Sequence, residues 1–277
     1  MIKKLFKFVF DIIRGTKEDA VGAYSAQSAF FMTISIIPFI MLLTSFIKFL
    51  PFSEEQMLSY VANVFPGGAR DLIASFISET FQKSDAAVIS VTAVYTLWSA
   101  SMGVFSVMKG LNRVYVTNET RSYFRIRITS MIYTLTVLVI MVLCLGVFVF
   151  GDTTMHVIEN SLSGKFGVLL LGMRKFIGIV VLSLFFLVMY VVVPNRKTKF
   201  ITQVPGALVS GIGWVGFSYL FSLYYESMET FSFLYGSLSV MVFFMLWIFI
   251  CIYILFVGAE INKLSEKQYE KMHSMKK

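Results

Sequence analysis

The sequence predicts an all-α membrane protein that crosses the bilayer several times. Of its 277 residues, 57% are apolar and only 14% are charged, compared with about 45–50% and about 25% in ordinary soluble domains. The mean hydropathy of +0.77 is too high for a chain whose whole surface faces water. The apolar runs lack the two-residue alternation of barrel strands and are about twice as long as such strands need to be. These observations exclude a soluble globular protein, a β-barrel and a disordered chain.

Six apolar runs are long enough to cross a membrane, because a bilayer core of about 30 Å needs roughly 20 apolar residues per helix. None of the runs has an acidic side chain in its central turns, where a charge costs about 2.5–3.5 kcal/mol on insertion. The predicted spans are residues 29–50, 86–108, 128–150, 176–193, 206–225 and 236–258.

The distribution of lysine and arginine predicts the orientation of these spans. Eighteen of the 24 basic residues lie before the first span, in the second and fourth loops, or after the sixth span. The positive-inside rule therefore places both termini in the cytoplasm. Arg174 and Lys175 fall on the opposite side, or at the headgroups with snorkelling stems. The net charge of +8 is thus explained by topology; it indicates membrane lipids as partners and no nucleic acid.

The segments outside the spans are also amphipathic or charged. Residues 1–27 are predicted to form a cytoplasmic helix lying in the interface, with Lys3, Lys7 and Arg14 on one face and apolar residues on another. The outer loop, residues 51–85, is predicted to be helical and either to pack at the interface or to cover a cavity. Residues 28–262 then form the six-helix transmembrane domain, and residues 263–277 form a charged cytoplasmic tail.

Small residues and prolines mark positions where helices pack closely or bend. The fifth span is predicted to begin at Pro205, since proline is well tolerated at a helix start. It continues with two pairs of small residues four positions apart, a spacing that lets helix backbones approach closely. A proline in the first span predicts a kink. The candidate packing or hinge positions are Pro38, Gly206, Ser210 and Gly211.

The residues of common catalytic and metal sites are scarce. The two histidines, His156 and His273, lie on opposite sides of the predicted membrane, and the two cysteines lie in different spans. There is no P-loop, no H-E-x-x-H and no G-x-S-x-G motif. We therefore expect no metal, no cofactor and no enzyme activity, and any transport is predicted not to be driven by ATP.

Several local patterns, taken in order along the chain, resemble the YihY/BrkB family of bacterial inner-membrane proteins. They are Ser35-Ile36-Ile37-Pro38, Trp98-Ser99-Ala100-Ser101-Met102-Gly103, Leu111-Asn112-Arg113-Val114-Tyr115, Pro194-Asn195-Arg196 and Gly258-Ala259-Glu260-Ile261-Asn262. The resemblance implies six helices with cytoplasmic termini in the bacterial inner membrane. The family formerly carried the label ribonuclease BN, but a zinc-dependent ribonuclease of that kind needs a histidine-rich ligand set, which two distant histidines cannot supply.

Polar residues close to the ends of spans are candidate site residues, because each is costly at membrane depth unless it is paired. They leave the second span, precede the third or leave the sixth, all on the predicted cytoplasmic side. These candidates for substrate binding or gating are Asn112, Arg113, Tyr115, Arg121, Arg127, Glu260 and Asn262. We hypothesise that Glu260 pairs with Arg113 or Arg127 and closes the cytoplasmic mouth of the bundle, either as a gate or as a static ion pair.

The family's association with virulence, serum resistance and lipid export implies a role at the cell envelope. The best interpretation is a transporter or flippase-like protein that moves an amphiphilic or small polar envelope-related substrate. A non-transporting membrane scaffold is the alternative, and a membrane-embedded enzyme is the third. The sequence leaves open the substrate and whether a second copy of the chain is a partner.

Overall fold

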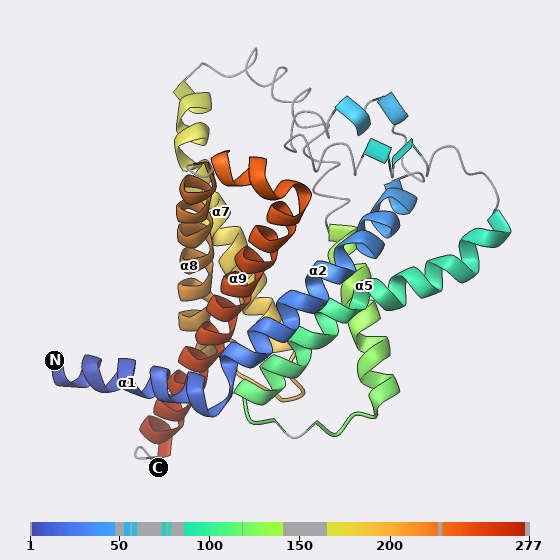
Figure 1. Ribbon diagram of the computed structural model, residues 1–277. Helices are drawn as coiled ribbons and strands as arrows, with labels where there is room; N and C mark the ends of the chain where they lie inside the picture. Colours follow the sequence, from blue (N-terminus) through green and yellow to red (C-terminus); the bar gives the residue numbers. More distant parts are fainter. Residues whose placement is uncertain are drawn as a thin grey trace. The chain divides into compact units, whose positions relative to one another are not determined.

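The computed structural model describes residues 2–47, 53–55, 57–59, 74–75, 77–78, 86–117, 119–140, 165–226 and 229–274. Within these ranges the regular structure is helical and no strand occurs, which confirms the all-α class. The long helices are α1 (Ile2–Glu18), α2 (Val21–Ile47), α5 (Ala86–Val114), α7 (Lys165–Val192), α8 (Phe200–Glu226) and α9 (Glu229–Ser274). A further helix covers Tyr123–Ile140. Figure 1 traces them in chain order.

As far as the described residues extend, each predicted span falls within one of these helices, except that the fourth ends one residue beyond α7. Four helical segments are long and apolar enough to cross a membrane: Val21–Leu43, Tyr123–Ile140, Phe200–Tyr224 and Met241–Lys271. Gly178–Val192 in α7 is a shorter apolar helix. The predicted second span, in α5, is not among the four, and it contains several serines, a tyrosine and a tryptophan. The chain is therefore a multi-pass helical protein, while six crossings and two cytoplasmic termini stay predictions.

The chain divides into two compact units. The first contains residues 1–33, 105–122 and 164–277, and the second contains residues 34–104 and 123–163. Helices α2 and α5 each contribute one part to each unit.

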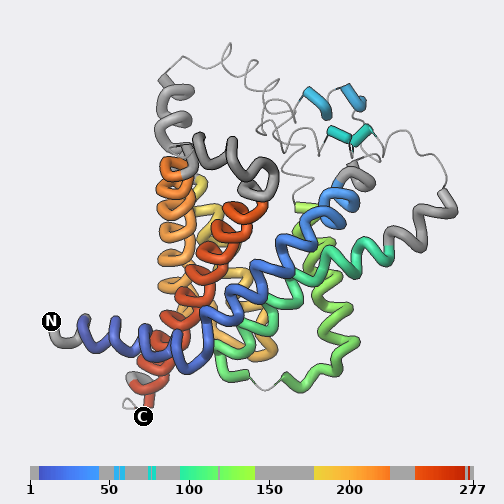
Figure 2. The backbone as a smooth tube through the Cα atoms, in the orientation of Figure 1, coloured from blue at the N-terminus to red at the C-terminus, as the bar shows by residue number. Residues whose placement is uncertain are grey.

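The centre of the first unit is the packing of α8 against both α7 and α9 (Figure 2). Aromatic rings join the three helices, because Trp214 of α8 contacts Phe186 of α7 and Trp247 of α9 at centroid distances of 5.5 and 5.8 Å. Deeper in the same contact, the buried Tyr190 hydroxyl lies 2.7 Å from Ser210 Oγ and donates to the carbonyl of Leu255 at 2.7 Å. The hydroxyl groups of Tyr190 and Ser210 thus have partners on the neighbouring helices.

Glycines make the close approach of these helices possible. A Cβ on Gly206 would overlap the backbone carbonyl of Gly258, and a Cβ on Gly211 would overlap the hydroxyl of Ser183. Ser210, the partner of Gly206 in the predicted small-residue pair, is fully buried. Close contacts at Gly206 and Gly211 and the burial of Ser210 fit the packing interpretation, while the role of these residues in packing or as a hinge stays a prediction.

The fifth-span helix begins earlier than predicted. Helix α8 starts at Phe200, so Pro205 lies inside it and not at its first position. The proline ring fixes a helical φ and has no N–H. Helix α8 therefore lacks the backbone hydrogen bond from Pro205 to the carbonyl of Ile201. The next N–H, of Gly206, donates to Asn262 Oδ1 of α9 at 2.7 Å. This cross-helix bond occurs next to the position that the proline disturbs.

The N-terminal segment forms two helices where one amphipathic segment, residues 1–27, is predicted. Helix α1 ends at Glu18, and α2 begins at Val21 after Ala20, whose φ of 51° is a left-handed value. The apolar face of α1 is exposed, with the Phe6 side chain 76% accessible. The predicted amphipathic pattern is therefore present in a helix, but its place in a membrane interface stays a prediction.

The second unit packs α2, α5 and the Tyr123–Ile140 helix around Leu42, Ala100 and Leu138. Pro38 lies within α2, which continues through it, and the predicted kink stays a prediction. Most of the predicted outer loop, residues 51–85, lies outside the described residues, and the described parts, 53–55, 57–59, 74–75 and 77–78, are largely helical.

Candidate functional site

The candidate site is a set of polar side chains in the first unit, where the end of α5, the start of α8 and the C-terminal half of α9 come together. Its members are drawn from segments that are far apart in sequence, and many are buried. Three groups of contacts make up the site, and each is described in turn.

The first group surrounds Tyr115, which follows the last turn of α5. Its hydroxyl donates to Gln203 Oε1 at 2.8 Å and accepts from Asn262 Nδ2 at 3.4 Å. Asn262 also accepts from the Gly206 N–H, so α8 and α9 are joined by this side chain. Burial raises the pKa of the Tyr115 phenol well above its usual value. The hydroxyl therefore acts as a neutral donor and acceptor and not as a charge.

Arg196, in the loop between α7 and α8, covers the other side of Tyr115. Its guanidinium carbon lies 3.7 Å from the centroid of the Tyr115 ring, an arrangement in which the cation is attracted to the ring face. Its Nη1 donates to Glu266 Oε2 of α9 at 2.6 Å, and both side chains are only 20% exposed. Arg196 thus connects the loop to α5 and to α9.

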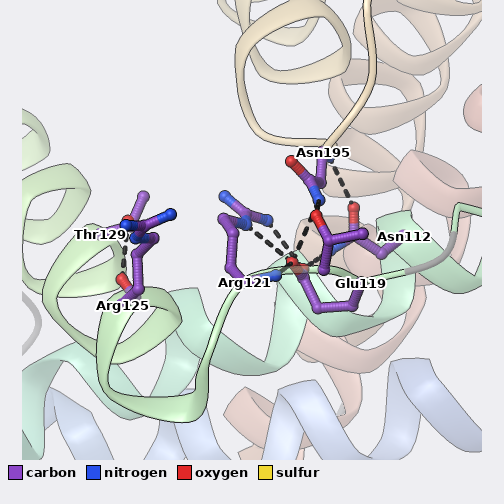
Figure 3. Close-up of polar contacts among 7 residues, drawn as sticks. Asn112, Glu119, Arg121, Arg125, Thr129 and Asn195 are labelled. Carbon is purple, nitrogen blue, oxygen red and sulfur yellow. Dashed lines mark hydrogen bonds and ion pairs between the residues drawn. The ribbon is translucent and has the colours of Figure 1, made fainter.

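The second group centres on Glu119, in the loop after α5 (Figure 3). Arg121 donates two guanidinium hydrogen bonds to this carboxylate, each 2.8 Å long, and its backbone N–H donates a third at 3.0 Å. Asn112 Nδ2 donates at 2.6 Å, and Asn195 Nδ2 donates at 3.2 Å. Since hydrogen bonds and charge favour the ionised form, the Arg121 guanidinium holds the pKa of the Glu119 carboxyl below its usual value.

This second group fastens two loops together. Asn112 Oδ1 accepts from the backbone N–H of Asn195 at 2.9 Å, while Asn195 Nδ2 also donates to Thr120 Oγ1 at 3.0 Å. Figure 3 shows Asn112, Glu119 and Arg121 facing Asn195 across this contact. It also draws Thr129, whose hydroxyl donates at 2.8 Å to the carbonyl of Arg125 in its own helix. The loop after α5 is thereby held against the loop before α8.

The third group joins α1 to α9. The Lys263 ammonium pairs with Asp19 and lies 3.5 Å from Glu260 Oε2. Glu260 is buried, and its other oxygen has no hydrogen-bond partner. Gly15 of α1 lies directly over this carboxylate, since a Cβ there would be 2.7 Å from Glu260 Oε2. One ammonium therefore serves two carboxylates where the helices meet.

The predicted site residues are partly brought together by these contacts. Tyr115 and Asn262 are directly bonded, and Asn112 and Arg121 share Glu119. Arg127 lies in the second unit, where its guanidinium stacks 4.4 Å from the centroid of Trp98 and donates to the Trp98 carbonyl.

The hypothesis that Glu260 pairs with Arg113 needs correction, whereas its pairing with Arg127, which lies in the second unit, stays a prediction. The cationic partner of Glu260 is Lys263, one helical turn further along α9. The physical reason is proximity on one helix face, because residues three apart lie side by side on a helix. Arg113 ends α5 as an exposed residue.

Sequence reasoning missed several members of the site. Asp19, Glu119, Gln203 and Lys263 are not among the predicted site residues; they fall in the N-terminal segment, the second loop, the fourth loop and the charged tail. The signals were present: Glu119 is an acid in a basic loop, and Gln203 is an amide beside an apolar span. Among the described residues no group of three or more His, Cys, Asp or Glu side chains is placed to hold a metal ion.

The fold and this buried polar site define a class: a multi-pass helical membrane protein. The family model described as Virulence factor BrkB matches residues 12–277, and the chain belongs to that family. It is 29% identical to the ribonuclease-like protein YfkH of Bacillus subtilis (strain 168), with 88% of this chain and 90% of the relative covered.

Other relatives carry only the description UPF0761 membrane protein. One from Vibrio vulnificus (strain YJ016) is 23% identical, covering 95% of this chain and 83% of its own length. One from Alteromonas mediterranea is 26% identical, and the match covers 90% of this chain and 84% of the relative. No solved structure matches the chain.

Proposed function

We propose that this protein is a transporter or flippase-like protein of the bacterial inner membrane. In this proposal it has six spans and cytoplasmic termini, and it moves an amphiphilic or small polar envelope-related substrate without ATP. The observation that carries the proposal is the buried polar site, where Tyr115, Gln203 and Asn262 join the end of α5 to α8 and α9. Buried polar groups at the ends of apolar helices are costly and commonly mark functional sites in membrane proteins.

The chemistry of the site supports this role. Arg196 and Lys263 supply cations beside apolar helices, and Asn262, Gln203 and Tyr115 supply neutral donors and acceptors. Such a mixture suits a substrate with a polar head and an apolar body. The ribonuclease-like name of one relative describes that protein, and we do not include such an activity in the proposal for this chain.

A membrane scaffold is the second candidate, and one observation favours it. The polar groups of Tyr190, Ser210, Asn112 and Glu119 already bond to one another or to backbone, as in a static bundle. A scaffold would need these contacts permanently, whereas a transporter would exchange some of them during its cycle.

Reconstitution of the purified full-length chain separates the two candidates. Liposomes are loaded with a fluorescently labelled phosphatidylglycerol or phosphatidylethanolamine, and a membrane-impermeant quencher reports the fraction of label reaching the outer leaflet. We expect the chain to speed this movement, and we expect Asn262→Leu to abolish it. Gly216→Ala is the matched control, since a Cβ at that position of α8 meets nothing within 4 Å. Movement no faster than in protein-free liposomes, with both labels, would count against a flippase and favour the scaffold.

The proposed orientation is tested separately by cysteine labelling. In a chain that carries Cys144→Ser and Cys251→Ser, single cysteines are introduced as Ser84→Cys and Ser274→Cys. A membrane-impermeant maleimide added to intact cells should label the first and not the second, because the positive-inside rule places the tail in the cytoplasm. The opposite pattern would overturn the orientation without bearing on the transport assay.

A further inference from the structure

The loop after α5 and the loop before α8 contain buried hydrogen-bond donors that have no acceptor. Arg196 Nε and Nη2 are buried and have no hydrogen-bond partner, and the same holds for the hydroxyls of Thr117 and Thr198. A buried donor without an acceptor is costly, so native structures seldom leave several of them together. The side chains come from the loops on either side of the Asn112–Asn195 contact.

The loops are held together, which places these groups in one region. Arg196 lies over the ring of Tyr115, and Tyr115 precedes Thr117 by two residues. The backbone N–H of Thr117 donates to the carbonyl of Asn112 at 2.9 Å, and Asn112 accepts from Asn195. Thr198 follows Arg196 by two residues. The four unpartnered groups therefore belong to one joined pair of loops and not to scattered places in the chain.

The two unpartnered nitrogen atoms of Arg196, Nε and Nη2, indicate which kind of acceptor group this side chain can bind. A guanidinium presents Nε–H and one terminal N–H along a single edge, and this edge binds two oxygens of a carboxylate or phosphate at once. Glu266 pairs with Nη1 and leaves the Nε–Nη2 edge unused. Two threonine hydroxyls can each donate one further bond. The matching acceptor has three or more oxygens, as a phosphate group does.

The surrounding charge favours an anion as well. Lys197 and Lys199 are exposed neighbours in the same loop, and α8 begins at Phe200 directly after them. A helix N-terminus adds partial positive charge. Glu266 and Glu119 are the acids that contact the two loops, and each already accepts from an arginine. The region is thus positively charged overall, with its acids neutralised.

We propose that Arg196, Thr117 and Thr198 bind the phosphate group of an anionic ligand. The Nε–Nη2 edge of Arg196 binds two phosphate oxygens, and the hydroxyls donate to the others. The Arg196 side chain is 20% exposed and its lysine neighbours are exposed, so binding requires only local side-chain movement. The ligand is either a free phosphate-bearing solute or the headgroup of an anionic lipid, which cytoplasmic basic clusters attract. The site stands whether or not the chain transports its ligand.

Two arms of one experiment distinguish these sources. In the first, the purified full-length chain in neutral detergent is titrated with inorganic phosphate, and with sodium chloride at equal ionic strength as the reference. In the second, the chain is placed in nanodiscs of phosphatidylcholine with and without phosphatidylglycerol. Thermal unfolding temperature and bound phosphorus are measured in both arms.

Three variants make the test specific. Thr198→Val removes one hydroxyl and keeps the shape, so it should fold normally and bind more weakly. Arg196→Lys keeps the charge but loses the two-donor edge, and we expect affinity to fall by about tenfold or more, as for loss of a charge-assisted bidentate pair. Lys197→Gln is the matched control for charge next to the site, and it should retain most of the binding.

Each outcome decides the proposal. Binding of inorganic phosphate that Thr198→Val and Arg196→Lys weaken supports a site for free phosphate groups. Dependence on phosphatidylglycerol alone, weakened by the same variants, supports a lipid headgroup. Binding that all three variants leave equal, or that Lys197→Gln weakens as much as Thr198→Val does, would overturn the proposal. So would the lack of a specific effect in both arms.

Discussion

Replacing Gly206 with alanine tests the closest contact between α8 and α9. The added Cβ would overlap the carbonyl oxygen of Gly258 and would lie 2.5 Å from Asn262 Oδ1, where ordinary contacts begin at 3.4 Å. The Gly258 carbonyl belongs to the backbone of α9 and cannot rotate away. The two helices must therefore separate, and the Gly206–Asn262 hydrogen bond of 2.7 Å must lengthen.

The magnitude follows from three terms. Forcing an extra methyl group into a packed interior costs about 1–3 kcal/mol. Losing the hydrogen bond to Asn262 costs about 0.5–1.5 kcal/mol. Alanine in place of glycine inside a helix returns about 0.8–1.0 kcal/mol. The second and third terms nearly cancel, so we expect Gly206→Ala to lower the free energy of unfolding by about 1–3 kcal/mol, the size of the packing term.

A matched variant isolates the contact from the intrinsic helix preference. Gly216 lies in the same helix, and a Cβ there meets nothing within 4 Å. Gly216→Ala should leave stability equal to or above that of the wild type, because only the favourable helix term remains. The assay is reversible unfolding of the purified chain in mixed micelles of increasing sodium dodecyl sulfate content, followed by tryptophan fluorescence. Equal stability of the two variants would refute the close approach of α8 and α9.

Two further predictions concern the charged groups. Lys263→Met leaves the carboxylates of Asp19 and Glu260 without their shared ammonium group. Because removing one partner of a buried ion pair costs about 3–5 kcal/mol, the free energy of unfolding in detergent should fall by that amount. An unchanged stability would contradict the shared pairing. Glu119 has a pKa held below its usual value by hydrogen bonds from Arg121, so its stabilisation is complete above the ordinary glutamate pKa and is lost as pH falls through the lowered value. Glu119→Gln should therefore flatten the acid side of the stability–pH profile by at most about 1 kcal/mol, and an unaltered profile would show that the carboxylate contributes nothing.

The helices and the chain's membrane character could be predicted from sequence because both depend on local composition. A run such as residues 206–225 is apolar over the length of a bilayer, and its helix follows from that run alone. Close packing at Gly206 and Gly211 was also predictable, since small residues four apart form one helix face. Helix starts were less predictable, because α8 extends back to Phe200 through the polar residues Thr202 and Gln203, beyond the apolar run.

The candidate site was predictable as a set of residues but not as a set of contacts. Asn112, Tyr115 and Asn262 stand out as polar groups at the ends of apolar runs, and the structure bonds Tyr115 to Asn262. The partner of Glu260 could not be deduced, because basic residues lie near the ends of several spans and the sequence does not show which of them lies closest to Glu260. Packing selects Lys263, which lies on the same face of α9 and also reaches Asp19.

The sequence by itself determined that this protein is helical, multi-pass and equipped with polar residues at the ends of its apolar segments. Hydropathy and helix period are properties of neighbouring residues, so they can be read without the fold. Only the tertiary structure decided that Arg196 stacks on Tyr115 with one edge of its guanidinium unpartnered. That arrangement depends on two loops about 80 residues apart being joined by Asn112 and Asn195, and no local pattern specifies which distant loops will meet.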